Sequence, residues 1–225
     1  MGRDSVAKER NEDAQLTQEW VKKLLGLFHG GLRNVKAGDI AQYLGVSKPT
    51  LYKYYSSKDE IVSAVVGYTI DTIEEKNKNL GKTHLSFKQR YLDFMLNSLE
   101  ISLLVSNELL DDLKTYYPKD FERILNMVKD CDNQFYDFYK EGIEKGIVRN
   151  IHPSVITLSN HRVLTEILQP NFLMQNELTF QDAFNSFVQL QLYGIFTDGN
   201  EESVEIQKTL KAKLKEIIES HNKGN

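Results

Sequence analysis

The sequence has very little cysteine and proline and no long apolar run. Cys131 is the only cysteine among 225 residues, which excludes an intrachain disulfide and a metal site built from several cysteines. The longest apolar run, residues 61–70, contains Ser63 and Gly67 and is too short to span a bilayer. The N-terminal stretch lacks the apolar segment of a signal peptide. We therefore expect a cytoplasmic protein in a reducing compartment.

Motifs of the common enzyme and metal-binding classes are missing as well. The sequence contains no phosphate-cradling glycine loop and no G-x-S-x-G turn around a nucleophilic serine. His152 and His161, with Glu166 and Glu177 nearby, are the grouping that comes closest to metal ligands, but their spacing matches no common metal motif. We expect no enzymatic activity, no metal and no cofactor.

The charge is mildly negative overall and positive in one window. The formal net charge is -4 and the pI is about 5.8, which argues against binding nucleic acid by bulk charge. Residues 33–58 nevertheless contain five lysines and arginines and a single acid, Asp39. A local basic face in this window is compatible with DNA binding.

Helical periodicity is the dominant pattern. Apolar residues recur three and four positions apart from Leu16 to Phe28, and similar spacing continues in blocks through the rest of the chain. Pro118, Pro153 and Pro170 lie between these blocks or at expected helix starts, and no segment alternates like a strand for long. The pattern predicts an all-α protein.

Two short helices separated by a glycine are predicted near the N-terminus. The first ends at Gly45, where a left-handed backbone suits glycine. Ser47 can cap the second, and Pro49 falls in its first turn, where no helical N–H is lost. Residues 57–60, Ser-Lys-Asp-Glu, then form a capping-box sequence before a long helix that runs to about Asn79.

This arrangement is typical of a helix-turn-helix, whose second helix enters the major groove of DNA. We expect Leu51 and Ile40 in the core, and Tyr55 mainly in the core, because adjacent helical positions cannot all face the duplex. Tyr54 stays open between the two environments. The predicted DNA-binding residues are Lys36, Ser47, Lys48, Pro49, Thr50, Tyr52, Lys53, Tyr54 and Lys58.

The same region resembles the DNA-binding signature of the TetR family of transcriptional regulators. The resemblance covers about Trp20 to Val66. It rests on Asp39-Ile40-Ala41, Leu44-Gly45-Val46-Ser47, Thr50-Leu51-Tyr52, Tyr54-Tyr55 and Ser57-Lys58-Asp59-Glu60. It implies a recognition helix that carries Lys48, Pro49, Thr50 and Tyr52, and backbone contacts from Tyr52 and Lys58. One departure is Lys36, which stands where the family usually has a capping Thr or Ser.

The resemblance also implies a homodimer, a palindromic operator and a divergent C-terminal ligand domain. We expect a three-helix DNA-binding domain at residues 1–60, joined by a long helix to a helical effector-binding and dimerisation domain at 61–225. Helices near 153–168 and 178–196 resemble the pair that forms the family's dimer interface. Their apolar residues spread around more than one face, although a thicker monomer core is the alternative.

The C-terminal part is rich in aromatic residues, which pack in a core more often than they line a pocket. A sensor domain still needs an apolar cavity with a few polar groups, and tyrosines beside methionines suit a hydrophobic or aromatic effector. The candidate effector-binding residues are Tyr91, Phe94, Met95, Tyr116, Tyr117, Phe121, Met127, Phe135, Phe138 and Tyr139.

The sequence therefore predicts a transcription regulator that binds operator DNA. The expected mode is repression relieved by a small molecule. The alternative is a TetR-like coactivator that binds another protein and does not contact DNA directly. No membrane partner is expected.

Overall fold

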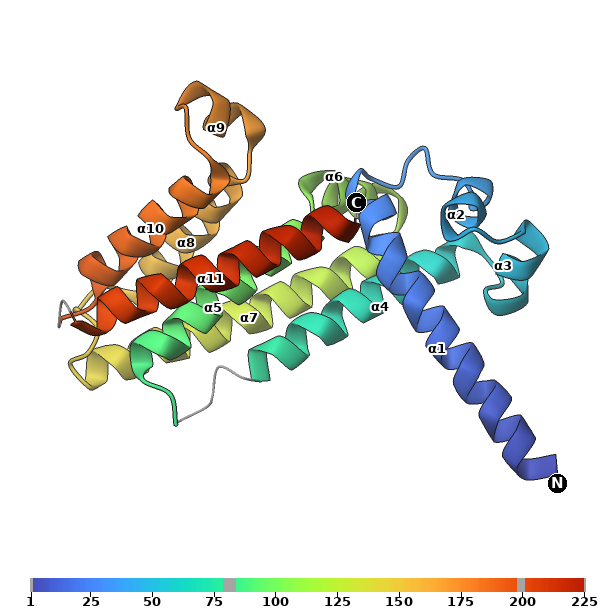
Figure 1. Ribbon diagram of the computed structural model, residues 1–225, viewed down its shortest axis with the longest axis horizontal. Helices are drawn as coiled ribbons and strands as arrows, with labels where there is room; N and C mark the ends of the chain where they lie inside the picture. The colour runs from blue at the N-terminus through green and yellow to red at the C-terminus, as the bar shows by residue number, and fades with distance from the viewer. Residues whose placement is uncertain (1, 79–83, 198–200, 225) are drawn as a thin grey trace. The chain divides into compact units, whose positions relative to one another are not determined.

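Helices account for all the regular elements in the described parts of the chain. The computed structural model describes residues 2–78, 84–197 and 201–224 (Figure 1). In chain order the helices are α1 (Gly2–His29), α2 (Ala37–Leu44), α3 (Lys48–Tyr54), α4 (Lys58–Asn77), α5 (Phe87–Leu104), α6 (Asn107–Tyr116), α7 (Pro118–Glu144), α8 (Pro153–Ile167), α9 (Pro170–Gln175), α10 (Phe180–Ile195) and α11 (Glu201–Gly224). The prediction of an all-α fold is confirmed over these residues.

The chain divides into two compact units. The first contains the described residues up to Thr72 together with Leu104–Leu125, and the second contains Ile73–Leu103 and Asn126–Lys223. The first unit thus takes α6 and the start of α7 from later in the chain. The boundary predicted at residue 60 separates a DNA-binding domain from an effector-binding domain, whereas the two units are defined by contacts between residues. The domain boundary therefore stays a prediction.

The core of the first unit holds the three N-terminal helices together. Trp20 and Leu24 of α1, Ile40 of α2, Leu51 of α3 and Ile61 of α4 are all buried. Because these side chains come from four helices, burying them fixes the orientation of the short α2 and α3, which could not be stable helices alone. α6 also packs against α1.

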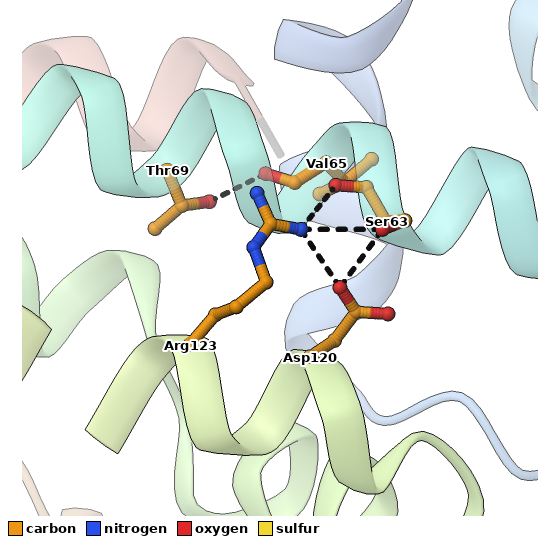
Figure 2. Close-up of polar contacts among 5 residues, drawn as sticks. All are labelled: Ser63, Val65, Thr69, Asp120 and Arg123. Carbon is orange, nitrogen blue, oxygen red and sulfur yellow. Dashed lines mark hydrogen bonds and ion pairs between the residues drawn. The ribbon is translucent and has the colours of Figure 1, made fainter. Parts of the chain in front are cut away.

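A polar contact fixes α4 to the start of α7 within the first unit (Figure 2). The carboxylate of Asp120, which is buried, accepts hydrogen bonds from the Ser63 hydroxyl at 2.9 Å and from Arg123 at 2.8 Å. Arg123 also donates to the backbone carbonyl of Ser63 at 3.3 Å. A charged acceptor with two donors satisfies the buried carboxylate and joins the two helices.

The core of the second unit is apolar and strongly aromatic. α5, α7, α8, α10 and α11 contribute to it, and α8 and α10 pack side by side with α9 at one end of the pair (Figure 1). Its fully buried large side chains include Tyr91, Tyr139, Phe184 and Phe196. An isolated antiparallel bridge between Val148 and Phe196 ties the loop after α7 to the end of α10.

Candidate nucleic-acid interface

The turn between α2 and α3 has the geometry that the sequence predicts. Gly45 adopts a left-handed backbone with φ of 71°, and its N–H bonds to carbonyls at the end of α2. The Ser47 hydroxyl accepts a hydrogen bond from the backbone N–H of Thr50 at 3.1 Å, with Pro49 in the first turn. These local bonds set the position at which α3 starts.

One face of α3 is buried and the other is open. Leu51 is buried and Tyr55, just after the helix, is 7% exposed, so the predictions that both lie in the core are confirmed. The opposite face presents Thr50, Tyr52 and Lys53, with Tyr52 47% exposed. Hydroxyl, phenol and ammonium groups on a single exposed helix face can contact base edges and phosphates.

Removing the Ser47 cap tests how much this turn contributes to stability. We expect Ser47→Ala to lower the free energy of unfolding by about 1 kcal/mol, because the Thr50 N–H loses its side-chain acceptor. Denaturant unfolding followed by circular dichroism measures it. Gln134→Ala, at an exposed position within α7, is the control and should change the stability by less than about 0.5 kcal/mol. Equal effects of the two substitutions would contradict the capping role.

Tyr54 is held by α1. Its hydroxyl donates to the Asp13 carboxylate at 2.9 Å, and its ring meets the Trp20 ring edge-on with 5.2 Å between centroids. The half-buried side chain therefore packs α3 onto α1. Its predicted DNA contact stays a prediction, and these contacts compete with it.

The lysines of the predicted interface differ in their surroundings. Lys48 is exposed and its side chain passes over Gly38 of α2, where an added Cβ would lie 2.8 Å from Lys48 Cε. Lys36 is exposed too, and its backbone N–H is capped by the Asp39 carboxylate at 2.7 Å. Asp39 thus supplies one half of a capping box, and Lys36, whose side chain has no acceptor, cannot supply the other half.

Lys58 points into the protein. Its ammonium donates to the carbonyl of Leu32 at 2.9 Å and lies 5.9 Å from the ring centroid of Tyr117. Burial lowers the pKa of Lys58, and the nearby carboxylates of Asp59, Asp112 and Asp39 oppose that shift. The predicted phosphate contact of Lys58 stays a prediction. It requires the ammonium to bind a DNA phosphate while it donates to the Leu32 carbonyl, or to release that carbonyl.

A contact that the sequence does not predict holds the loop between α1 and α2. One oxygen of the Asp112 carboxylate, on α6, accepts hydrogen bonds from the backbone N–H groups of Leu32 at 2.6 Å and Arg33 at 2.8 Å. Gly31 has φ of 94°, and a Cβ there would lie 2.8 Å from that same carboxylate oxygen. The Ser106 hydroxyl donates to the carbonyl of His29 at 2.5 Å. α6 therefore fixes the loop that leads into α2.

The capping box at the start of α4 forms only in part. The Ser57 hydroxyl accepts from the Glu60 N–H at 3.2 Å, as predicted. The Glu60 carboxylate, however, reaches the N–H of Ser56 at 2.6 Å, one residue before the position that the reciprocal motif requires. The Ser56 hydroxyl also donates to this carboxylate at 2.6 Å, and the two hydrogen bonds from Ser56 lower the pKa of Glu60.

The ten candidate effector-binding residues are divided between the two units. Tyr116, Tyr117 and Phe121 belong to the first unit. A surface pocket of that unit is lined by Leu32, Arg33, Lys58, Asp59, Tyr116 and Tyr117. The other seven belong to the second unit, and six of them form or border its core: Tyr91, Phe94, Met95, Phe135, Phe138 and Tyr139.

The helices predicted to form a dimer interface have two apolar faces. Leu164 of α8 and Phe187 of α10 are buried within the second unit. Val155 and Leu158 of α8 are 58% and 56% exposed, and Leu190 of α10 is 67% exposed. Exposed large apolar side chains on these two helices are compatible with an interaction surface.

The described residues contain neither a candidate membrane-spanning helix nor a cluster of metal-ligating side chains. No helix in those ranges is both long and apolar enough to cross a membrane. No three His, Cys, Asp or Glu side chains among the same residues are grouped so that they could hold a metal ion. His152 has a structural contact instead, because its Nδ1 accepts the Ser154 N–H at 3.3 Å and so caps α8.

A capped short helix with an exposed polar face, set after a glycine turn, defines a helix-turn-helix protein with an added helical unit. Residues 26–65 match the family model described as bacterial regulatory proteins, tetR family. A Bacillus subtilis relative, described as the uncharacterized HTH-type transcriptional regulator YvaF, is 25% identical over 161 residues, which are 71% of this chain and 85% of the relative.

Solved structures of regulators share the fold. A TetR transcriptional regulator from Chloroflexus aurantiacus aligns with a TM-score of 0.64 at 13% identity, over 83% of this chain and 98% of the other. AibR, in complex with isovaleryl coenzyme A and operator DNA, aligns with a TM-score of 0.58 at 15% identity, over 78% and 97% of the two chains. Residues 26–65 are therefore similar to the DNA-binding region of TetR-family regulators, and the chain shares its fold with solved structures of such regulators.

Proposed function

We propose that this regulator represses transcription by binding a palindromic operator as a homodimer, and that a small molecule bound by its second unit releases it. The observation that carries the proposal is α3, which buries Leu51 and presents Thr50, Tyr52 and Lys53 to solvent. In a helix-turn-helix this helix enters the major groove. Residues 1–60 would then bind DNA, and residues 61–225 would bind the effector and the partner.

The small number of base pairs that one short helix can contact favours dimerisation. α3 has seven residues and can contact only a few base pairs. Two copies fixed about 34 Å apart read successive major grooves on one side of the duplex and multiply the specificity. The exposed apolar residues of α8 and α10 supply a surface that a second copy can cover.

Release by a small molecule is supported by the fold. The AibR structure with isovaleryl coenzyme A and operator DNA shows that a protein of this fold accommodates both kinds of ligand. In the present chain an effector can release the operator only by binding the released conformation more tightly than the bound one.

Substitutions on α3 test the DNA-binding face. After selection of genomic fragments by the purified protein, we expect Thr50→Ala and Tyr52→Ala each to weaken binding to the selected operator by about 10-fold to 100-fold. Both side chains are exposed, so their loss removes DNA contacts and leaves the core intact. Electrophoretic mobility shifts at several salt concentrations measure the affinity, which should fall steeply with salt.

Tyr136→Ala is the matched control, because Tyr136 is an exposed tyrosine on α7 of the second unit. It should bind the operator with wild-type affinity. Operator binding that is unchanged in both α3 variants would contradict the assigned interface. Failure of the wild-type protein to select any fragment would contradict direct DNA binding.

A further inference from the structure

The core of the second unit contains polar atoms that the protein itself leaves without hydrogen bonds. Within the described residues, Tyr91 Oη on α5, Asn160 Oδ1 on α8 and Gln191 Oε1 on α10 have no hydrogen-bond partner. Each of the three residues is at most 6% exposed. Buried polar groups in proteins are nearly always paired, because leaving one unpaired destabilises the fold. Three such groups in a single core therefore require an explanation.

Asn160 is hydrogen-bonded to one of two neighbouring buried tyrosines, Tyr139 and Tyr91. Asn160 Nδ2 donates to the hydroxyl of Tyr139 at 2.7 Å, and the ring centroids of Tyr139 and Tyr91 lie 6.5 Å apart. Both tyrosines are fully buried. Burial raises the pKa of each phenol well above its usual value, so both remain neutral O–H groups at physiological pH. Within the described residues the Tyr91 hydroxyl has no hydrogen-bond partner, whereas the Tyr139 hydroxyl is paired with the Asn160 amide.

Apolar rings surround this polar core, which we define as Tyr91, Tyr139 and Asn160. Phe94 lies 6.1 Å from Tyr91 and 6.2 Å from Tyr139, and Phe196 lies 5.3 Å from Tyr91, between ring centroids. Gln191 adds an acceptor on α10, the helix that packs against α8. The surroundings are those of a ligand site, in which a few polar groups orient a molecule among apolar walls.

We propose that the polar core recognises the effector, and that the effector is an uncharged molecule with an apolar body and a hydroxyl or amide head group. The inference rests on the proposed function and specifies its ligand. The Tyr91 hydroxyl needs an acceptor, while Asn160 Oδ1 needs a donor, and a hydroxyl or an amide supplies both. A hydrocarbon supplies neither, and a carboxylate supplies no donor.

Because the polar core is buried, binding of the effector requires a change in the conformation of the protein. Because Tyr91 and Tyr139 are covered by packed rings, a ligand reaches them only when the surrounding helices shift. The conformation that accepts the ligand therefore differs from the empty one. A ligand that binds only the shifted conformation is one that changes the population of the two states.

Four molecules with the same ring and different head groups test the proposal: benzyl alcohol, benzamide, toluene and benzoate. Calorimetric titration of the full chain in the absence of DNA measures their affinities. We expect benzyl alcohol or benzamide to bind at least about 10-fold more tightly than toluene and benzoate. That ratio corresponds to the net contribution of a hydrogen bond to a buried hydroxyl.

Tyr91→Phe separates recognition from folding, because it removes a single oxygen and keeps the ring. Its affinity for the alcohol or amide should fall to that for toluene, whereas Tyr136→Phe, at an exposed position of α7, should bind as the wild type does. Without ligand, Tyr91→Phe should melt about 2–4 °C higher, because an unpaired buried hydroxyl is gone.

Three results would overturn the proposal: binding of none of the four molecules, toluene binding as tightly as benzyl alcohol, or full affinity in Tyr91→Phe. A lower melting temperature of Tyr91→Phe would also overturn it, since a partner such as a buried water would then satisfy the hydroxyl. Operator binding is measured separately with ligand-free protein. Loss of the ligand-site proposal therefore leaves the DNA-binding proposal standing, and the reverse also holds.

Discussion

Leu190→Glu should convert a dimer of this chain into monomers and weaken operator binding by at least about 100-fold. Leu190 is more exposed than Val155 and Leu158, so in a monomer a glutamate at position 190 remains in water. In a symmetric dimer every residue of the interface occurs twice. The substitution then buries two carboxylates, each of which costs several kcal/mol without a partner.

The loss of affinity has a geometric cause. A monomer contacts one half-site through a single α3, and the second half-site no longer adds to the same binding event. We expect the substitution to leave α3 and the helical content unchanged, because Leu190 lies on α10 of the second unit and is outside its buried core. The defect is thus one of assembly and should not alter the secondary structure seen by circular dichroism.

Sedimentation velocity and mobility shifts with the selected operator measure the two effects. Leu125→Glu is the matched control, because Leu125 is a half-exposed leucine on α7, outside α8 and α10. It should sediment as a dimer and bind the operator normally. A wild-type protein that sediments as a monomer, or a Leu190→Glu protein that remains dimeric, would contradict the interface.

The sequence was sufficient where local chemistry determines the structure. Gly45 ends α2 because few other residues adopt its left-handed backbone, and Ser47 caps α3 through its own hydroxyl. Leu51 and Tyr55 are buried because helical spacing places them on the side opposite the polar residues. Each of these interactions joins residues close in sequence, so each can be recognised from a short pattern.

The sequence was insufficient to predict contacts where a side chain can bind either DNA or another part of the protein. Tyr54 and Lys58 fit a DNA-binding pattern, yet Tyr54 bonds to Asp13 and Lys58 to the carbonyl of Leu32. These partners lie 41 and 26 residues away along the chain. Which partner a long polar side chain takes depends on tertiary packing, which a local pattern does not contain.

The effector-binding residues illustrate a second limit. Residue type predicts that Tyr91 and Tyr139 are buried, but it does not show whether their hydroxyls have partners. That depends on the residues on α8 and α10 that pack opposite them, and only the folded core shows Asn160 bonded to Tyr139 and Tyr91 left unpaired. The sequence also grouped Tyr117 with them, although it belongs to the other compact unit.

Asp112→Ala should lower the free energy of unfolding by about 2–4 kcal/mol and weaken operator binding as well. The carboxylate accepts two backbone N–H groups, and hydrogen bonds to a charged group contribute roughly 1.5–3 kcal/mol each. Because Arg33 is exposed, water replaces the acceptor at its N–H and reduces the total loss. Leu32 is buried, so its N–H finds no water to replace the lost acceptor. Without these bonds the loop that leads into α2 loses its fixed position. The position of α3 then changes as well, because α3 packs against α2.

Asp112→Asn distinguishes the two contributions of this side chain. An asparagine oxygen can still accept from the loop, but without the charge each bond is weaker, so we expect about half of the stability loss of Asp112→Ala. Asp111→Ala, at the exposed neighbouring position of α6, is the control. Denaturant unfolding and operator mobility shifts should rank the proteins in the order wild type and Asp111→Ala, then Asp112→Asn, then Asp112→Ala. If Asp112→Ala matches Asp111→Ala in both measurements, the contact from α6 does not fix the positions of α2 and α3.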